Sequence, residues 1–200
     1  MEKKNLFTSK NIATLAILSA LIIVIQLISG FLKIGPVNFS FVLIPIVVGA
    51  MSIGPLGGAF LGVVFGLICF IMGIVGMDPL TYLLISNHPI ITFLTCVVKG
   101  SAAGFVSGII YKSLFNKKEN LGVMLASISA PIINTGLFIL GALIMSDTIN
   151  LFMSTNQISG NVIYFLVIMC AGVNFLVEFA LNALFSPSIY RVMKYVNKRR

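Results

Sequence analysis

Six polar residues lie within long apolar stretches of the chain, where a polar side chain is costly unless it is paired, hydrated or bound to a ligand. They are Gln26, Lys99, Asn134, Asn174, Glu178 and Asn182. Asn174, Glu178 and Asn182 follow at intervals of four residues, which places them on one face of a helix. At 1.5 Å per helical residue, Lys99 lies about 15 Å below one membrane face and Asn174 about 20 Å, with Asn134 at a similar depth. We therefore expect Lys99, Asn134 and Asn174 to share a central polar pocket.

Lys99 admits three interpretations. It binds an anionic ligand with its ammonium group, it forms a structural ion pair with Glu178, or it extends toward water. By the same helical rise Glu178 lies about 6 Å deeper than Asn174, and a helix bend would close that gap. For the asparagines the alternative to ligand binding is hydrogen bonding between helices, which we favour for Asn182.

Catalysis has little support in the sequence. His88 is the only histidine, and Asn87 and Pro89 beside it are typical of a helix N-cap and first helical residue, so a ligand contact by His88 is the alternative to a helix start. Zinc-protease, carboxylate-pair, phosphate-loop and nucleophile-elbow motifs are all missing from the sequence. Three isolated cysteines, Cys69, Cys96 and Cys170, are read as small core residues. We expect no enzyme activity, no cofactor and no metal.

Composition and charge indicate a membrane protein. The chain is 58% hydrophobic with a mean hydropathy of +1.10, and only 9% of its residues are charged. The net charge of +8 therefore reflects topology rather than nucleic-acid binding. Eleven of the thirteen Lys and Arg residues fall in the N-terminal tail, the segment 112–118 and the C-terminal tail. Positive segments face the cytoplasm in membrane proteins, so we expect both termini and the 112–120 loop to be cytoplasmic and the segment 75–89 to be outside.

Hydropathy predicts an all-α, integral membrane six-helix bundle that forms one transmembrane domain over residues 1–200. The expected spans are 12–32, 39–53, 56–74, 90–111, 121–145 and 161–185. The second is short for a span and contains Pro45, which suggests a kinked or partly inserted helix. The third carries glycines at four-residue spacing from Gly58, which lets another helix backbone approach closely. Segment 75–89 reads as irregular, and Ser186-Pro187 as the end of the last helix.

Several stretches resemble the S components, the substrate-binding membrane subunits, of energy-coupling factor (ECF) vitamin transporters. The resemblance covers nearly the whole chain and is carried by its opening helix and by its second and third spans: Asn11-Ile-Ala-Thr-Leu-Ala-Ile-Leu-Ser-Ala20, Leu43-Ile-Pro-Ile-Val-Val-Gly-Ala50 and Gly54-Pro-Leu-Gly-Gly-Ala-Phe-Leu-Gly62. It implies that Ala16 and Ala20, four residues apart, contact a transmembrane coupling subunit. It also implies two cytoplasmic ATPases as partners, a multi-pass location in the cell membrane, and delivery of a vitamin through the ATP-driven complex.

Three further stretches are most similar to pantothenate-type members: Lys99-Gly100, Asn134-Thr-Gly136 and Asn174-Phe-Leu-Val-Glu178. The candidate substrate-binding residues are Lys99, Asn134, Asn174, Glu178 and His88. Folate, riboflavin and thiamin-related vitamins stay open as ligands, although the absence of Trp disfavours large planar ones. A stand-alone secondary carrier and a structural scaffold are the competing classes. The lack of a visible inverted repeat speaks against the carrier, and Lys99 at middle depth speaks against the scaffold.

Overall fold

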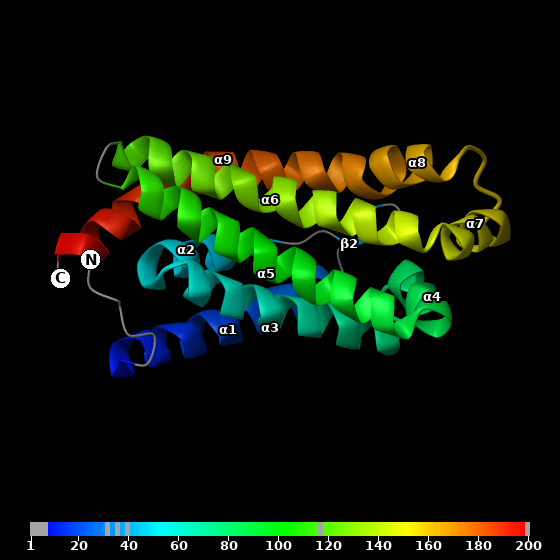
Figure 1. Ribbon diagram of the computed structural model, residues 1–200, viewed down its shortest axis with the longest axis horizontal. Helices are drawn as coiled ribbons and strands as arrows, with labels where there is room; N and C mark the ends of the chain where they lie inside the picture. The colour runs from blue at the N-terminus through cyan, green and yellow to red at the C-terminus, as the bar shows by residue number, and fades with distance from the viewer. Residues whose placement is uncertain (1–7, 31–32, 35–36, 39–40, 116–117, 199–200) are drawn as a thin grey trace.

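The computed structural model describes residues 8–30, 33–34, 37–38, 41–115 and 118–198. These residues form an elongated helical bundle (Figure 1). Its helices are α1 (Ser9–Ser29), α2 (Leu43–Ile53), α3 (Pro55–Ile74), α4 (Pro79–Asn87), α5 (Pro89–Leu114), α6 (Glu119–Ile144), α7 (Ser146–Thr155), α8 (Val162–Tyr164), the π-helical stretch η1 (Phe165–Gly172) and α9 (Val173–Lys198). Two short antiparallel strands, β1 (Lys33–Ile34) and β2 (Val37–Asn38), follow α1.

Five helical segments in the described part of the chain are long and apolar enough to cross a membrane: α1, α3, α5, α6 and the run formed by α8, η1 and α9. The predicted all-helical membrane architecture is thus present, with five such segments where we expected six. The expected second span is represented by α2, whose 11 residues are too few to cross.

Helix α2 lies inside the bundle. Nearly all of its residues are buried, and it packs against α1, α3, α5, α6 and α9. Pro45 occupies the first turn, where a backbone N–H has no acceptor within the helix, so it produces no mid-helix kink. Gly54 then turns the chain directly into α3 with φ of +121°, a conformation that side chains disfavour.

Helices α3 and α5 meet backbone to backbone along their glycines. A Cβ atom added at Gly58 would meet the backbone of Gly104, and one added at Gly62 would meet Gly100. Gly66 faces the backbone of Cys96 in the same way. The predicted close-packing glycine face is confirmed, and its partner is α5, the helix that carries Lys99.

Three expectations about the helices are wrong. Segment 75–89 contains α4, because the Asp78 carboxylate accepts a hydrogen bond from the Thr81 backbone N–H (3.1 Å) and Pro79 follows as the first helical residue. Asn87 ends α4 rather than capping α5. The last helix continues past residue 185 to Lys198, and Ser186 Oγ donates to the Ala183 carbonyl, whose helical donor is lost at Pro187.

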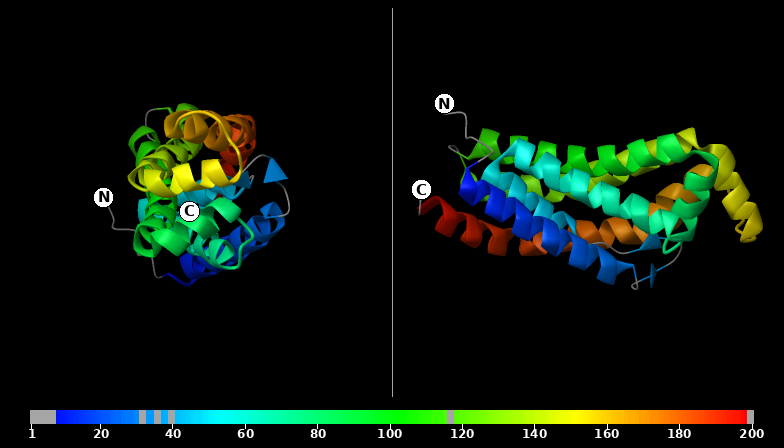
Figure 2. Two further views of the ribbon diagram at one scale, coloured as in Figure 1. Left: turned by 90° about the vertical axis from the view of Figure 1, so that its right-hand side faces the viewer. Right: turned by 90° about the horizontal axis from the view of Figure 1, so that it is seen from below.

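The two ends of the bundle differ in composition. Helix α1 begins, α9 ends and α5 connects to α6 at one end, while α4 and α7 cover the other (Figures 1 and 2). The first end carries basic residues on the described helices and beside them: Lys10, Lys112, Lys118, Arg191 and Lys194. The remaining cations of the predicted basic segments, Lys3, Lys4, Lys117, Arg199 and Arg200, lie outside the described residues, and Lys198 ends α9.

Candidate ligand-binding site

A cavity of about 80 Å³ lies between the helices in the half of the bundle that α4 and α7 cover. Its walls come from α1, α3, α4, α5, α6, η1 and α9. About 10–15 Å³ is enough to hold one water molecule, so this space holds several. Ten polar or charged residues of the described chain, cysteines aside, line it: Gln26, Asp78, Thr81, Thr92, Thr95, Lys99, Asn134, Thr135, Asn174 and Glu178.

Close packing of α5 on α3 fixes the position of Lys99. Its neighbour Gly100 contacts Gly62 on α3. The Lys99 side chain therefore begins beside the interface of α3 and α5, next to the aromatic ring of Phe65. The Lys99 Nζ lies 5.7 Å from the centre of the Phe65 ring and 5.2 Å from that of Phe138. Both distances are within the range of cation–π attraction. Lys99 and Glu178, both in the described part of the chain, form no ion pair with each other.

Asn174 and Glu178 lie one turn apart on α9, as their spacing predicts. Asn174 Nδ2 donates a long hydrogen bond of 3.5 Å to Glu178 Oε1. Three oxygens of the lining residues on α6 and α9 have no hydrogen-bond partner in the described part of the chain and are shielded from water: Asn134 Oδ1, Asn174 Oδ1 and Glu178 Oε2. The cavity therefore combines one cation with several acceptors that still need donors.

Asn182 is absent from the cavity lining. Its Nδ2 donates to the backbone carbonyl of Glu178 at 2.9 Å. That bond lies within α9. The Asn182 amide nitrogen therefore makes a bond inside its own helix instead of the expected bond between helices.

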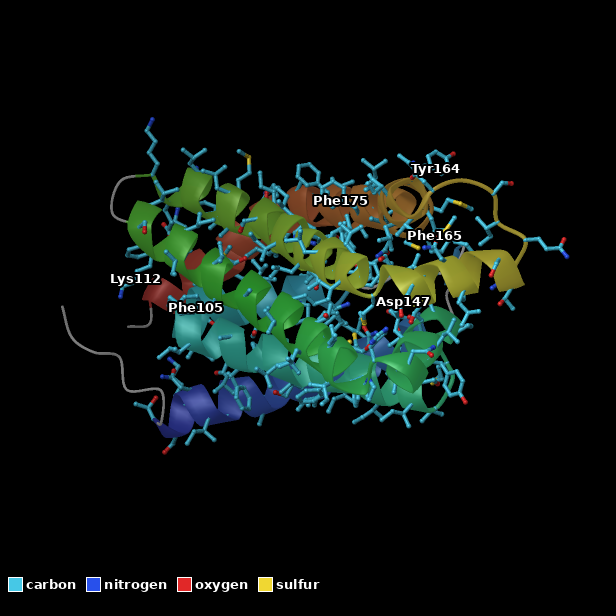
Figure 3. The ribbon with its side chains drawn as sticks, turned by 45° about the vertical axis from the view of Figure 1, so that its right-hand side comes forward. Phe105, Lys112, Asp147, Tyr164, Phe165 and Phe175 are labelled. Atoms are coloured by element: carbon cyan, nitrogen blue, oxygen red, sulfur yellow. The ribbon has the colours of Figure 1, made fainter. Side chains whose placement is uncertain are left out.

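The structure does not bring His88 to the cavity. Its Nε2 lies 3.1 Å and 3.0 Å from the two carboxylate oxygens of Asp147, a contact that joins the start of α5 to the start of α7. Figure 3 shows Asp147 at this end of the bundle and Lys112 at the other. The hydrogen bond from His88 lowers the pKa of the exposed Asp147 carboxyl, so that carboxyl stays ionised to a lower pH than an ordinary aspartate does.

Ala16 and Ala20 lie on the outer surface of α1. Both are exposed, as is Ala13 one turn earlier. Helix α1 packs against α2 and α3 and presents large apolar residues on its open side, with Ile17 68% exposed. The two alanines thus leave a shallow surface between bulkier neighbours, of the kind that a second helix can approach closely.

Several cavity residues were not predicted as site residues. Thr92, Cys96 and Lys99 follow at i, i+4 and i+7, so one helical face carries all three, and this spacing would have identified the first two. Cys69 and Cys170 also line the cavity, and all three cysteines are free. Among the described residues, no three His, Cys, Asp or Glu side chains are grouped to hold a metal ion.

Comparison with known families gives a match over most of the chain. The family model described as "ECF transporter, substrate-specific component" covers residues 10–190, a range that includes every described residue that lines the cavity. A search of curated proteins finds no significant match.

Proposed function

Because the chain belongs to the family of substrate-specific components of ECF transporters, we propose that its cavity captures pantothenate from outside the cell for delivery through an ATP-driven complex. Members of this family bind a small molecule and associate with other ECF subunits. The five apolar helices are consistent with a multi-pass membrane protein. In this assignment the chain itself hydrolyses nothing, and two cytoplasmic ATPases supply the energy.

The observation that carries this proposal is Lys99, a cation beside a buried cavity that forms no ion pair with any carboxylate of the described residues. An ammonium group in such a place favours an anionic ligand, because a charge-assisted hydrogen bond is stronger where water is scarce. Pantothenate supplies a carboxylate for Lys99. Its amide and hydroxyl groups supply hydrogen-bond donors for the oxygens of Asn134 and Asn174.

The aromatic side chains of the cavity also bear on the choice of vitamin. The volume of about 80 Å³ is below the roughly 300–1,000 Å³ of typical small-molecule pockets, so pantothenate and the larger vitamins alike require the cavity to widen. Among the described lining residues only Phe65 and Phe138 are aromatic, and Lys99 lies near both rings. A planar vitamin that binds by stacking would have to displace the lysine from them.

We propose that Ala16 and Ala20 dock the transmembrane coupling subunit. Their exposure on α1 supports this assignment, since side chains no larger than methyl let a partner helix come close. We also propose that both termini and the 112–120 loop are cytoplasmic. The basic residues at that end of the bundle support this orientation.

Isothermal titration of the purified protein with pantothenate and its amide analogue tests the ligand assignment. Lys99→Met removes the charge but keeps most of the length. We expect it to weaken pantothenate binding by roughly one to two orders of magnitude, the equivalent of about 1.5–3 kcal/mol for a charge-assisted hydrogen bond. Binding of the amide analogue should change little.

Lys112→Met is the matched control, because Lys112 is exposed on the same helix at the far end of the bundle (Figure 3). This variant should bind both compounds as the unmodified protein does. An undiminished preference for the acid over the amide in Lys99→Met would remove Lys99 from the site.

A further inference from the structure

Hydrogen-bond acceptors that have no partner among the described residues line the cavity from two helices. Asn134 on α6 and Glu178 on α9 are 6% and 2% exposed, and each has such a side-chain oxygen. Asn174, one turn from Glu178, has a third. Lys99 reaches the cavity from another helix, α5. The positive group and the acceptors thus come from different helices around the same cavity.

The orientation of the Glu178 carboxylate follows from its neighbour. Asn174 Nδ2 donates to Glu178 Oε1, so the amide nitrogen of Asn174 faces the carboxylate and its oxygen is left over. The second carboxylate oxygen, Oε2, has no donor. A buried carboxylate is unfavourable unless its oxygens receive hydrogen bonds or meet a cation, and Glu178 forms no ion pair with Lys99. No described residue donates to this free oxygen, and a hydroxyl group of a molecule in the cavity can supply the missing donor.

We propose that Glu178 selects the ligand by accepting hydrogen bonds from the hydroxyl groups of that ligand, while its anionic group binds Lys99 on α5. The site then takes a carboxylate whose far end carries hydroxyl donors, and it discriminates against compounds of the same size that have only acceptors or apolar groups there. This inference builds on the proposed function, since it presumes a ligand with its acidic group at Lys99.

A purely structural glutamate would have different surroundings. It would pair with Lys99 or receive hydrogen bonds at both oxygens, since both partners are available in the same bundle. Instead Oε2 has no hydrogen-bond partner among the described residues, although Glu178 lines the cavity. A buried carboxylate oxygen that has no donor beside a cavity is a candidate acceptor for a group of the ligand.

The test measures the affinity of the unmodified protein and of Glu178→Gln for two compounds, pantothenate and an analogue in which hydrogen replaces both hydroxyl groups. The unmodified protein should prefer pantothenate by about tenfold or more, because hydrogen bonds to a charged acceptor are among the stronger ones. In Glu178→Gln this preference should shrink to a few-fold at most, while the preference for the acid over the amide stays. Glu178→Asp keeps the carboxylate but shortens the side chain by one methylene, which moves its oxygens away from the cavity. This variant should therefore also lose the preference for pantothenate over the analogue without hydroxyl groups.

Asn182→Leu is the control, because Asn182 lies on the same helical face but does not line the cavity. It should keep the hydroxyl preference. If the unmodified protein binds no pantothenate, the proposed function fails and this inference with it. If it binds pantothenate but the full hydroxyl preference persists in both Glu178 variants, or the unmodified protein shows none, only the role of Glu178 is overturned.

Discussion

The glycine contacts between α3 and α5, called the seam below, hold Lys99 in place. Gly62→Ala disturbs this seam by adding a single Cβ atom. The added Cβ would meet the backbone carbonyl of Gly100 and the amide nitrogen of Ser101. Backbone atoms in the middle of a helix cannot turn aside as a side chain can, so the two helices must separate. Overpacking of this kind costs about 1–3 kcal/mol, and the better helix propensity of alanine offsets up to about 1 kcal/mol.

We therefore expect Gly62→Ala to lower the free energy of unfolding by about 1–2 kcal/mol. Ligand affinity should fall too, because Lys99 precedes the residue that is displaced. Gly136→Ala is the matched control, since a Cβ at Gly136 has no atom within 4 Å and the change should be neutral or stabilising. Unfolding in detergent and titration with pantothenate measure both effects. Equal stability of the two variants would refute the account of the seam.

Two further predictions concern assembly and topology. Replacing Ala16 and Ala20 with Leu should abolish co-purification with the coupling subunit and leave ligand affinity intact. The control is Leu at Ala180, which is exposed on α9 and should change neither co-purification nor ligand affinity. A collapse of ligand binding in the double variant would mean that the two alanines are internal packing residues. Cysteines introduced at Asn120 and Met77 should react with an impermeant reagent from opposite sides of the membrane, and reaction of both from one side would contradict the proposed orientation.

The sequence predicts the polar centre well because depth in a membrane helix is simple arithmetic. Lys99, Asn134, Asn174 and Glu178 come from three helices, and the structure brings all four to one cavity. Apolar surroundings make each of these residues conspicuous in the sequence. The glycine face of α3 is predictable for a related reason, since a stripe of small residues on a membrane helix indicates the close approach of another helix backbone.

The rest of the site depends on contacts that the sequence does not reveal. Thr92 and Thr95 are unremarkable in an apolar run, because each hydroxyl donates to a carbonyl one turn earlier in its own helix. Asp78 was read as part of an irregular loop, although it caps α4 and lines the cavity. His88 contacts Asp147, which lies 59 residues further along the chain, and does not line the cavity.

Helix ends show the same limit. Pro187 signals a helix end by its lack of an N–H, but Ser186 satisfies the Ala183 carbonyl at 2.8 Å and the helix continues. For α2 the reverse holds. The apolar residues of α2 suggest contact with membrane lipid. Its burial among five helices shows that these residues contact protein instead.

The most direct test of the central claim is to identify what the protein carries when it is purified from its membrane. Mass spectrometry of the extracted ligand, from the unmodified protein and from Lys99→Met, measures both identity and occupancy. We predict pantothenate in near-equimolar amount on the unmodified protein and little of it on the variant. A vitamin without a carboxylate, or equal occupancy in the two proteins, would contradict capture of an acidic vitamin by Lys99.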